Sequence, residues 1–199
     1  MNAPANHASN ETILLRHDQA GVSTLTLNRP KQYNALSNAL LDALLLEFNK
    51  IAEDKTIRVI VIAGAGKAFC AGHDLKEMRA NYEVGATEAL FKKCSEVMIK
   101  LTQLPQPVIA KVQGMATAAG CQLVAQCDLA VCSDNASFAT SGVNLGLFCS
   151  TPGVALARNL PRKQALEMLL TGDFIDAQTA LQRGLANRVV ALDKLDQTV

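Results

Sequence analysis

The chain has 199 residues, of which 49% are hydrophobic, and its formal net charge is +1. This much apolar material in a chain of this length predicts one soluble globular domain with a core of its own. The near-neutral charge argues against nucleic acid or an anionic membrane as the main partner, and no apolar run approaches the ~18–20 residues of a membrane helix.

The first ten residues are polar and contain neither Arg nor an apolar stretch. They are therefore typical of neither a secretory signal nor a transit peptide, and we expect a disordered tail over residues 1–10, one domain over residues 11–199 and a cytoplasmic location. The six cysteines form no Cys-x-x-Cys pair, and there are only three histidines. This spacing predicts free buried thiols and no metal site.

The first predicted elements are a hairpin and a helix. Residues 13–16 and 22–28 read as strands on either side of turn residues. Ser37 is a suitable N-cap for a helix that reaches about residue 52. An apolar stripe follows one face of that helix, formed by Leu40, Leu41, Leu44, Leu45, Phe48 and Ile51.

Residues 58–62 form a nearly unbroken apolar run, which indicates a strand buried on both faces. The two glycines that follow resemble the start of a dinucleotide-binding turn. Phe69 stands where the third glycine would be needed, so we reject a dinucleotide site. A second amphipathic helix is expected over residues 85–104, where prolines end it.

The most informative stretch runs from Gln113 to Val131. It joins a strand expected over residues 108–112 to a helix through a turn and the small residues 116–120, and then returns to a second apolar run. The first N–H groups of a helix lack an intrahelical partner and carry the positive end of its dipole, so small residues there let an anion approach the backbone. Tight packing of a helix on a sheet explains the same small residues equally well.

Short elements are expected in the last third of the chain. Helices are predicted over residues 152–160, 162–171 and 176–183, and strands over residues 136–139 and 187–190. A glycine follows each of the last two helices, as is typical of a helix C-terminus.

Two of these segments resemble the oxyanion-hole motifs of the crotonase family, also called the enoyl-CoA hydratase/isomerase family. The first motif, Phe-x-Ala-Gly-x-Asp-Leu, is matched by residues 69–75, and the second, Asn-Gly-x-Ala-x-Gly-Gly-Gly-Cys-Glu-Leu, is matched in part by residues 113–123. The likeness continues in residues 28–36 and 170–185, so it covers nearly the whole chain. It implies an α/β fold, the crotonase-type spiral of repeated ββα units.

In the family two backbone N–H groups bind the thioester oxygen, and the resemblance places them at His73 and Ala119. A changed side chain does not remove a backbone donor, and each donor is typically worth about 2.7–4 kcal/mol of transition-state stabilisation. The resemblance also implies no permanently bound cofactor, an acyl-CoA thioester as partner, and a homotrimer or dimer of trimers. Coenzyme A, as part of the substrate, would lie along Lys31, Asn34, Ala35, Ala71, Gly72, Asp74, Leu75 and Lys76.

The two glutamates with which the hydratases activate water are both replaced, the first by Gln122 and the second by Gly142. Glutamine is no base near neutral pH and glycine has no side chain, whereas acid–base catalysis contributes about 10²–10⁴-fold. We therefore expect chemistry that needs no base, such as decarboxylation of a malonyl-type thioester. An inactive acyl-CoA-binding or regulatory module and a weak hydratase are the alternatives.

Further expectations concern His73, Cys149 and the end of the chain. The His73 side chain could titrate near neutral pH, whereas Cys149 lacks a base that would activate it as a nucleophile. Residues 142–158, with the His73-Asp74 pair, resemble the subgroup called enoyl-CoA hydratase domain-containing protein 3, which is mitochondrial in animals. The family's further C-terminal helices are expected to be absent from this chain or not included in it.

Overall fold

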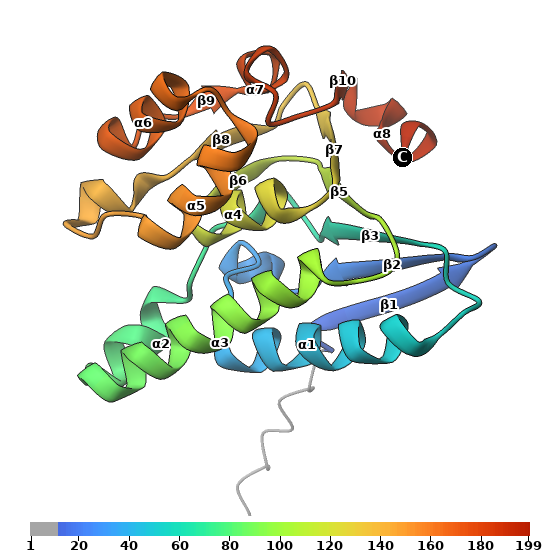
Figure 1. Cartoon of the computed structure of the whole chain (residues 1–199), viewed down its shortest axis with the longest axis horizontal. Helices are drawn as coiled ribbons and strands as arrows, with labels where there is room; N and C mark the ends of the chain where they lie inside the picture. Colours follow the sequence, from blue (N-terminus) through green and yellow to red (C-terminus); the bar gives the residue numbers. More distant parts are fainter. Residues whose placement is uncertain (1–11) are drawn as a thin grey trace, which may run out of the picture.

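The computed structural model describes residues 12–199, and the tail predicted over residues 1–10 lies outside them. Two sheets form the centre of the molecule, with helices around them (Figure 1). The larger sheet has the strand order β1 (Leu14–Gln19), β2 (Val22–Leu27), β3 (Val59–Gly64), β5 (Val108–Val112), β7 (Leu129–Ser133) and β10 (Arg188–Val190). The smaller sheet has the order β4 (Ala68–Cys70), β6 (Met115–Thr117), β8 (Ser137–Ala139) and β9 (Ile175–Asp176).

Three consecutive units each give one strand to each sheet and then turn into a helix. β3 and β4 precede α2 (Leu75–Ala80) and α3 (Val84–Thr102), β5 and β6 precede α4 (Ala119–Gln126), and β7 and β8 precede α5 (Ser150–Asn159). Equivalent strands of successive units pair in parallel, since each helix carries the chain back to the start of the next strand. The predicted spiral of ββα units is confirmed.

The N-terminal part adds the predicted hairpin and long helix. β1 and β2 are antiparallel, with Leu14 opposite Leu27. α1 (Asn38–Glu53) begins where predicted, because the Ser37 hydroxyl accepts the Leu40 N–H at 3.2 Å. Its apolar stripe is largely buried, and α1 packs beside α3 (Figure 1).

The C-terminal part contains short elements. It comprises α6 (Arg162–Thr171), α7 (Ala177–Arg183), α8 (Leu195–Thr198) and the 3₁₀ turns η2 (Ser141–Leu145) and η3 (Leu192–Lys194); a further 3₁₀ turn, η1 (Pro30–Gln32), precedes α1. Gly172 and Gly184 end α6 and α7 with φ of 69° and 87°, as predicted for glycine at helix ends. No helix within residues 12–199 is long and apolar enough to cross a membrane.

Two glycines allow close contact between backbone segments where α4 and β6 pack on β4 and the residue before it. A Cβ atom at Gly114 would clash with the Lys67 carbonyl oxygen, and one at Gly120 with the Cys70 carbonyl oxygen. The small residues of this stretch therefore do serve tight packing. Phe69 is fully buried in β4, so the turn before it leads into a strand and not into the helix of a dinucleotide site, as predicted.

Candidate functional site

The first motif forms a turn between β4 and α2 that pairs with Leu36. The Leu36 N–H donates to the Gly72 carbonyl oxygen (2.7 Å), and the Asp74 N–H donates to the Leu36 carbonyl oxygen (3.2 Å). In this parallel bridge the middle residue, His73, directs its own N–H away from Leu36. Among residues 12–199 no group accepts a hydrogen bond from the His73 N–H.

Gly72 brings the second motif against this turn. Its φ is +89°, and a Cβ atom there would lie 3.0 Å from the Ala118 Cβ and 3.2 Å from the Ala119 nitrogen. Both the positive φ and the close approach favour glycine. The two predicted donors, His73 and Ala119, therefore lie on segments that are in direct contact.

Helix α4 begins directly after a strained residue. Ala118 has φ 49° and ψ −120°, a combination that costs a residue with a Cβ atom about 1–3 kcal/mol. Its N–H donates to the Ala139 carbonyl oxygen (2.9 Å), which fixes this turn to β8. The Ala119 N–H has no acceptor within the described chain and lies at the positive end of the helix dipole. This backbone can bind an oxygen that carries negative charge.

The His73 side chain is a neutral, packed group. Its ring stands edge-on to Phe91, with 5.1 Å between the centroids, and its buried Nε2 has no hydrogen-bond partner within residues 12–199. Burial lowers the pKa of His73 to about 4. The prediction that this side chain titrates near neutral pH is therefore wrong.

Asp74 holds the start of α2. Its carboxylate accepts the N–H groups of Lys76 (3.1 Å) and Glu77 (3.2 Å) and pairs with the Arg29 guanidinium (2.9 Å). Burial disfavours the charge, but Arg29 and the two N–H groups outweigh it and keep the pKa of Asp74 below its usual range. Sequence reasoning did not include Arg29 in the site. Arg29 lies in residues 28–36, which carry part of the family resemblance, so that likeness could have pointed to it.

Asn34 lies inside the segment expected to follow coenzyme A. Its fully buried amide accepts the Arg29 backbone N–H (2.9 Å) and donates to the carbonyl oxygens of Ala65 (2.9 Å) and Ala68 (2.8 Å). The Asn34 side chain is thus occupied in joining two loops and is not presented to a ligand. Ala35, next to it, is also buried.

The other residues predicted for coenzyme A lie nearer the surface. The side chains of Lys31, Leu75 and Lys76 are exposed, and Ala71 is half-buried. Tyr33, two residues after Lys31, is 43% exposed. The Lys67 ammonium lies 5.1 Å from the centre of the Tyr33 ring, close enough for a cation–π contact.

The two positions of the missing glutamates differ in their surroundings. Gln122 is only 5% exposed, and its Oε1 has no partner among the described residues. Gly142 lies in η2, where a Cβ atom would stand 2.5 Å from the Leu147 carbonyl oxygen and 2.7 Å from Cys149 Sγ. The backbone at position 142 therefore leaves no room for a side chain.

The cysteines are all buried and free, as predicted. Burial raises the pKa of Cys149, although the Gly142 N–H on its sulfur opposes the shift. Burial also raises the pKa of four others to about 12, namely Cys70, Cys94, Cys121 and Cys132. These groups are thiols at neutral pH, and a thiol is a poor nucleophile.

Comparison with known proteins gives a consistent result. Residues 17–199 match the family described as enoyl-CoA hydratase/isomerase. A rat protein named enoyl-CoA hydratase domain-containing protein 3, mitochondrial, is 47% identical over 98% of this chain and 65% of its own length. A solved structure of an enoyl-CoA hydratase from Mycobacterium smegmatis has a TM-score of 0.93 and 59% identity over 94% of this chain and 74% of its own. The human domain-containing protein 3 structure has a TM-score of 0.91 and 48% identity, with the same coverage.

Two points follow from these relatives. The chain spans about 65% of the length of the curated relatives that it matches first. The rat, frog, mouse, human and zebrafish proteins of that name are all called mitochondrial, and this overturns the cytoplasmic location predicted from the polar N-terminal residues.

Proposed function

Because the chain belongs to the enoyl-CoA hydratase/isomerase family, we propose that it binds an acyl-CoA thioester and polarises the thioester carbonyl. The resemblance to the domain-containing protein 3 subgroup, predicted from residues 142–158, is confirmed as well. In this proposal the donors are the N–H groups of His73 and Ala119, and residues 11–199 form the acyl-CoA-binding domain.

The observation that carries the proposal is the contact between the two motifs at Gly72. Neither the His73 N–H nor the Ala119 N–H has an acceptor within the described chain, and a Cβ at Gly72 would crowd the second of them. Donors held by a fixed backbone need no reorganisation when charge develops on the thioester oxygen. Coenzyme A then lies along the segments proposed for it, at Lys31, Ala35, Ala71, Gly72, Asp74, Leu75 and Lys76.

We further propose that the reaction needs no carboxylate base. Position 122 carries an amide, and position 142 has neither a side chain nor room for one. In decarboxylation of a malonyl-type thioester the bond from the α-carbon to the carboxylate breaks, and its electron pair forms the enolate that the two N–H groups stabilise. Carbon dioxide leaves, and the α-carbon then takes a proton from water. No base is needed to start this sequence.

The test combines binding and turnover. The protein is titrated with crotonyl-CoA, malonyl-CoA and methylmalonyl-CoA, with heat measured by calorimetry and products followed by chromatography in the same samples. Loss of carbon dioxide from either carboxylated thioester is the expected result. Absence of binding to all three would refute the proposal.

A second function is favoured by the same two replaced glutamates, namely an acyl-CoA-binding or regulatory module without catalysis. It predicts tight binding of crotonyl-CoA and no product from any of the three thioesters. A weak hydratase would instead require a carboxylate from elsewhere; it predicts slow conversion of crotonyl-CoA to the 3-hydroxyacyl thioester. A trimer or dimer of trimers is proposed for the assembly, to be checked by light scattering.

A further inference from the structure

We propose that Arg29 is a positioning residue that holds the His73 N–H in place, an inference that rests on the proposed function. Arg29 Nη1 donates to the Ala35 carbonyl oxygen (2.5 Å) and Nη2 to the Asp74 carboxylate (2.9 Å). Its own backbone N–H is fixed by Asn34 (2.9 Å). One guanidinium therefore joins the loop before α1 to the turn that carries His73.

The reason that this link matters is the weak packing of α2. None of the six residues of α2 is buried, and of these six only Met78 packs, partly buried, against the hydrophobic core, so the core contributes little to where the helix begins. A helix start with little apolar anchoring depends mainly on its polar contacts. His73 immediately precedes the N-cap of this helix, so any displacement of Asp74 is transmitted to the His73 N–H through one peptide unit.

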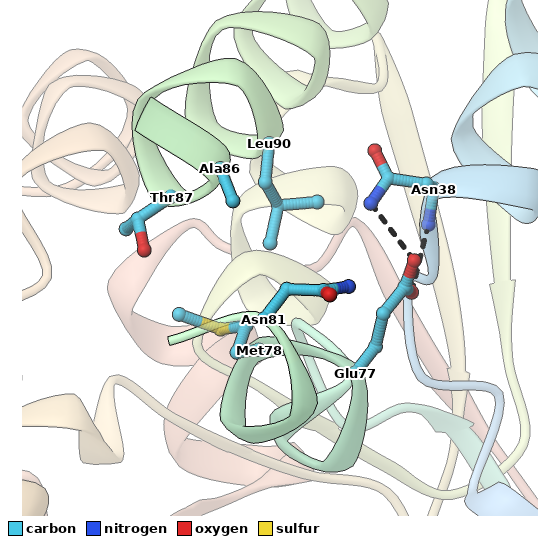
Figure 2. A pocket seen from close by; sticks show the side chains of 7 residues that line it. All are labelled: Asn38, Glu77, Met78, Asn81, Ala86, Thr87 and Leu90. Atoms are coloured by element: carbon cyan, nitrogen blue, oxygen red, sulfur yellow. Dashed lines mark hydrogen bonds between the residues drawn. The ribbon is translucent and has the colours of Figure 1, made fainter. Parts of the chain in front are cut away.

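A second polar link joins α2 to the first residue of α1 (Figure 2). The Glu77 carboxylate accepts both the backbone N–H (3.0 Å) and the side-chain N–H (2.8 Å) of Asn38, the first residue of α1. Beside this pair is a cavity of about 30 Å³, against which Met78 and Leu90 also lie. Because apolar packing of α2 is sparse, the Arg29 link and the Glu77 link add to the Leu36 backbone bridge in holding the start of this helix.

Arginine suits this place because its planar fork reaches two acceptors at once, whereas a lysine ammonium is a single point charge. The Arg29 and Asp74 side chains are 17% and 12% exposed. Loss of the guanidinium would leave a mostly buried carboxylate without its cation, which is unfavourable. We expect Asp74 then to turn toward water, give up the N-cap and shift the His73 N–H.

The test uses crotonyl-CoA labelled with ¹³C at the thioester carbonyl and measures the carbonyl stretching band by infrared spectroscopy. Binding to the unmodified protein should move the band to lower wavenumber, because the N–H groups polarise the bond. Arg29→Gln and Arg29→Lys should lose roughly half of that shift, since one of the two donors is displaced. Asp74→Ala removes both the N-cap acceptor and the partner of Arg29, and should give a similar loss.

Arg183→Gln is the matched control. Arg183 is 18% exposed and pairs at 2.6 Å with Glu167, which is 57% exposed, so its loss removes an equally buried arginine from an ion pair outside both motifs. It should lower the melting temperature without moving the carbonyl band. If Arg29→Gln does not fold, Arg29→Lys and Asp74→Ala carry the test.

The outcomes separate the two proposals. Failure of the unmodified protein to bind, or to shift the band, refutes the proposed function and this inference with it. A normal shift in the unmodified protein that stays intact in the folded Arg29 and Asp74 variants refutes the role of Arg29 alone. Where turnover is found, kcat should fall by roughly ten- to a hundredfold in the Arg29 variants, with a smaller change in KM.

Discussion

The proposed site contains two regions that differ in whether the groups expected from the family resemblance are still present. The proposed donor region, residues 71–74 and 118–120, would work through backbone N–H groups, and its two segments are in contact although Ala118 and Ala119 replace glycines of the family motif. The carboxylate region, positions 122 and 142, would work through side chains, and both have changed. A backbone N–H group remains when its side chain is replaced, whereas a carboxylate is lost with its side chain.

The largest effect is expected from a substitution within the donor region, at Gly72. A methyl group at Gly72 would press on the Ala119 nitrogen at 3.2 Å, so we expect Gly72→Ala to lower turnover of any accepted acyl-CoA by about 10²–10³-fold. Calorimetric affinity for crotonyl-CoA should weaken with it. Gly184→Ala is the control, because its φ of +87° imposes the same backbone strain while the nearest atom is 3.5 Å away. Equal losses in both variants would contradict the crowding argument.

The second prediction concerns the His73 side chain and its contribution to stability at acid pH. The pKa of His73 is about 4 in the folded chain and about 6.5 in an unfolded one. The unfolded state therefore binds more protons between these values, and stability falls as pH drops from 6.5 to 4, by at most about 3 kcal/mol.

Denaturant unfolding from pH 7 to pH 4 measures this loss. His73→Gln should flatten the curve over that window while leaving crotonyl-CoA binding at pH 7 nearly unchanged, because the N–H remains. His17→Gln, at an exposed histidine, should leave the curve as it is. An acid loss equally steep in His73→Gln would show that other groups cause it.

A third experiment tests whether the carboxylate region can be restored. Gln122→Glu returns one carboxylate only, so hydration of crotonyl-CoA should stay near the uncatalysed rate. Gly142→Ala should cost about 1–3 kcal/mol of stability, because the methyl group meets the Leu147 carbonyl oxygen at 2.5 Å. Gly85→Ala, with nothing within 4 Å of the new methyl, should instead stabilise slightly. Efficient hydration by Gln122→Glu alone would overturn the view that both carboxylates are required.

The smallest effect is expected from a substitution that relieves backbone strain in the donor region, at Ala118. Ala118→Gly removes a Cβ atom from a residue at φ 49° and should raise the free energy of unfolding by about 1 kcal/mol, measured by urea denaturation. Ligand binding should be unchanged. Ala20→Gly relaxes a similar φ of 52° in the hairpin turn, far along the chain from the donors. A gain at Ala20 with a loss at Ala118 would mean that the Ala118 methyl is needed for packing.

The sequence predicted the long elements because their apolar residues repeat. The second hairpin strand, α1, β5 and α6 begin and end within one or two residues of expectation, whereas the first hairpin strand extends to Gln19, three residues beyond its predicted end. The short β4 and α2 were missed, since three or six residues show no period. Asp74 and Glu77 have the spacing of a capping box, and that pattern would have revealed α2.

The site was less predictable, because its decisive contacts join distant parts of the chain. The resemblance identified the backbone donors from local motifs. The pKa of His73 depends on burial beside Phe91, and the role of Asn34 depends on loops 31 and 34 residues away. The lack of space for a side chain at Gly142 arises because Leu147 and Cys149 fold back against it. The local spacing of residues predicts none of these features.

The contact between Tyr33 and Lys67 has an optical consequence. The chain contains no tryptophan and only two tyrosines, so its ultraviolet emission comes from Tyr33, in the segment proposed for coenzyme A, and from Tyr82, which is 86% exposed just before α3. A Tyr82→Phe protein would emit from Tyr33 alone. If coenzyme A lies along this segment as proposed, its binding should quench the Tyr33 phenol beside the Lys67 ammonium, which would report occupancy without any attached dye.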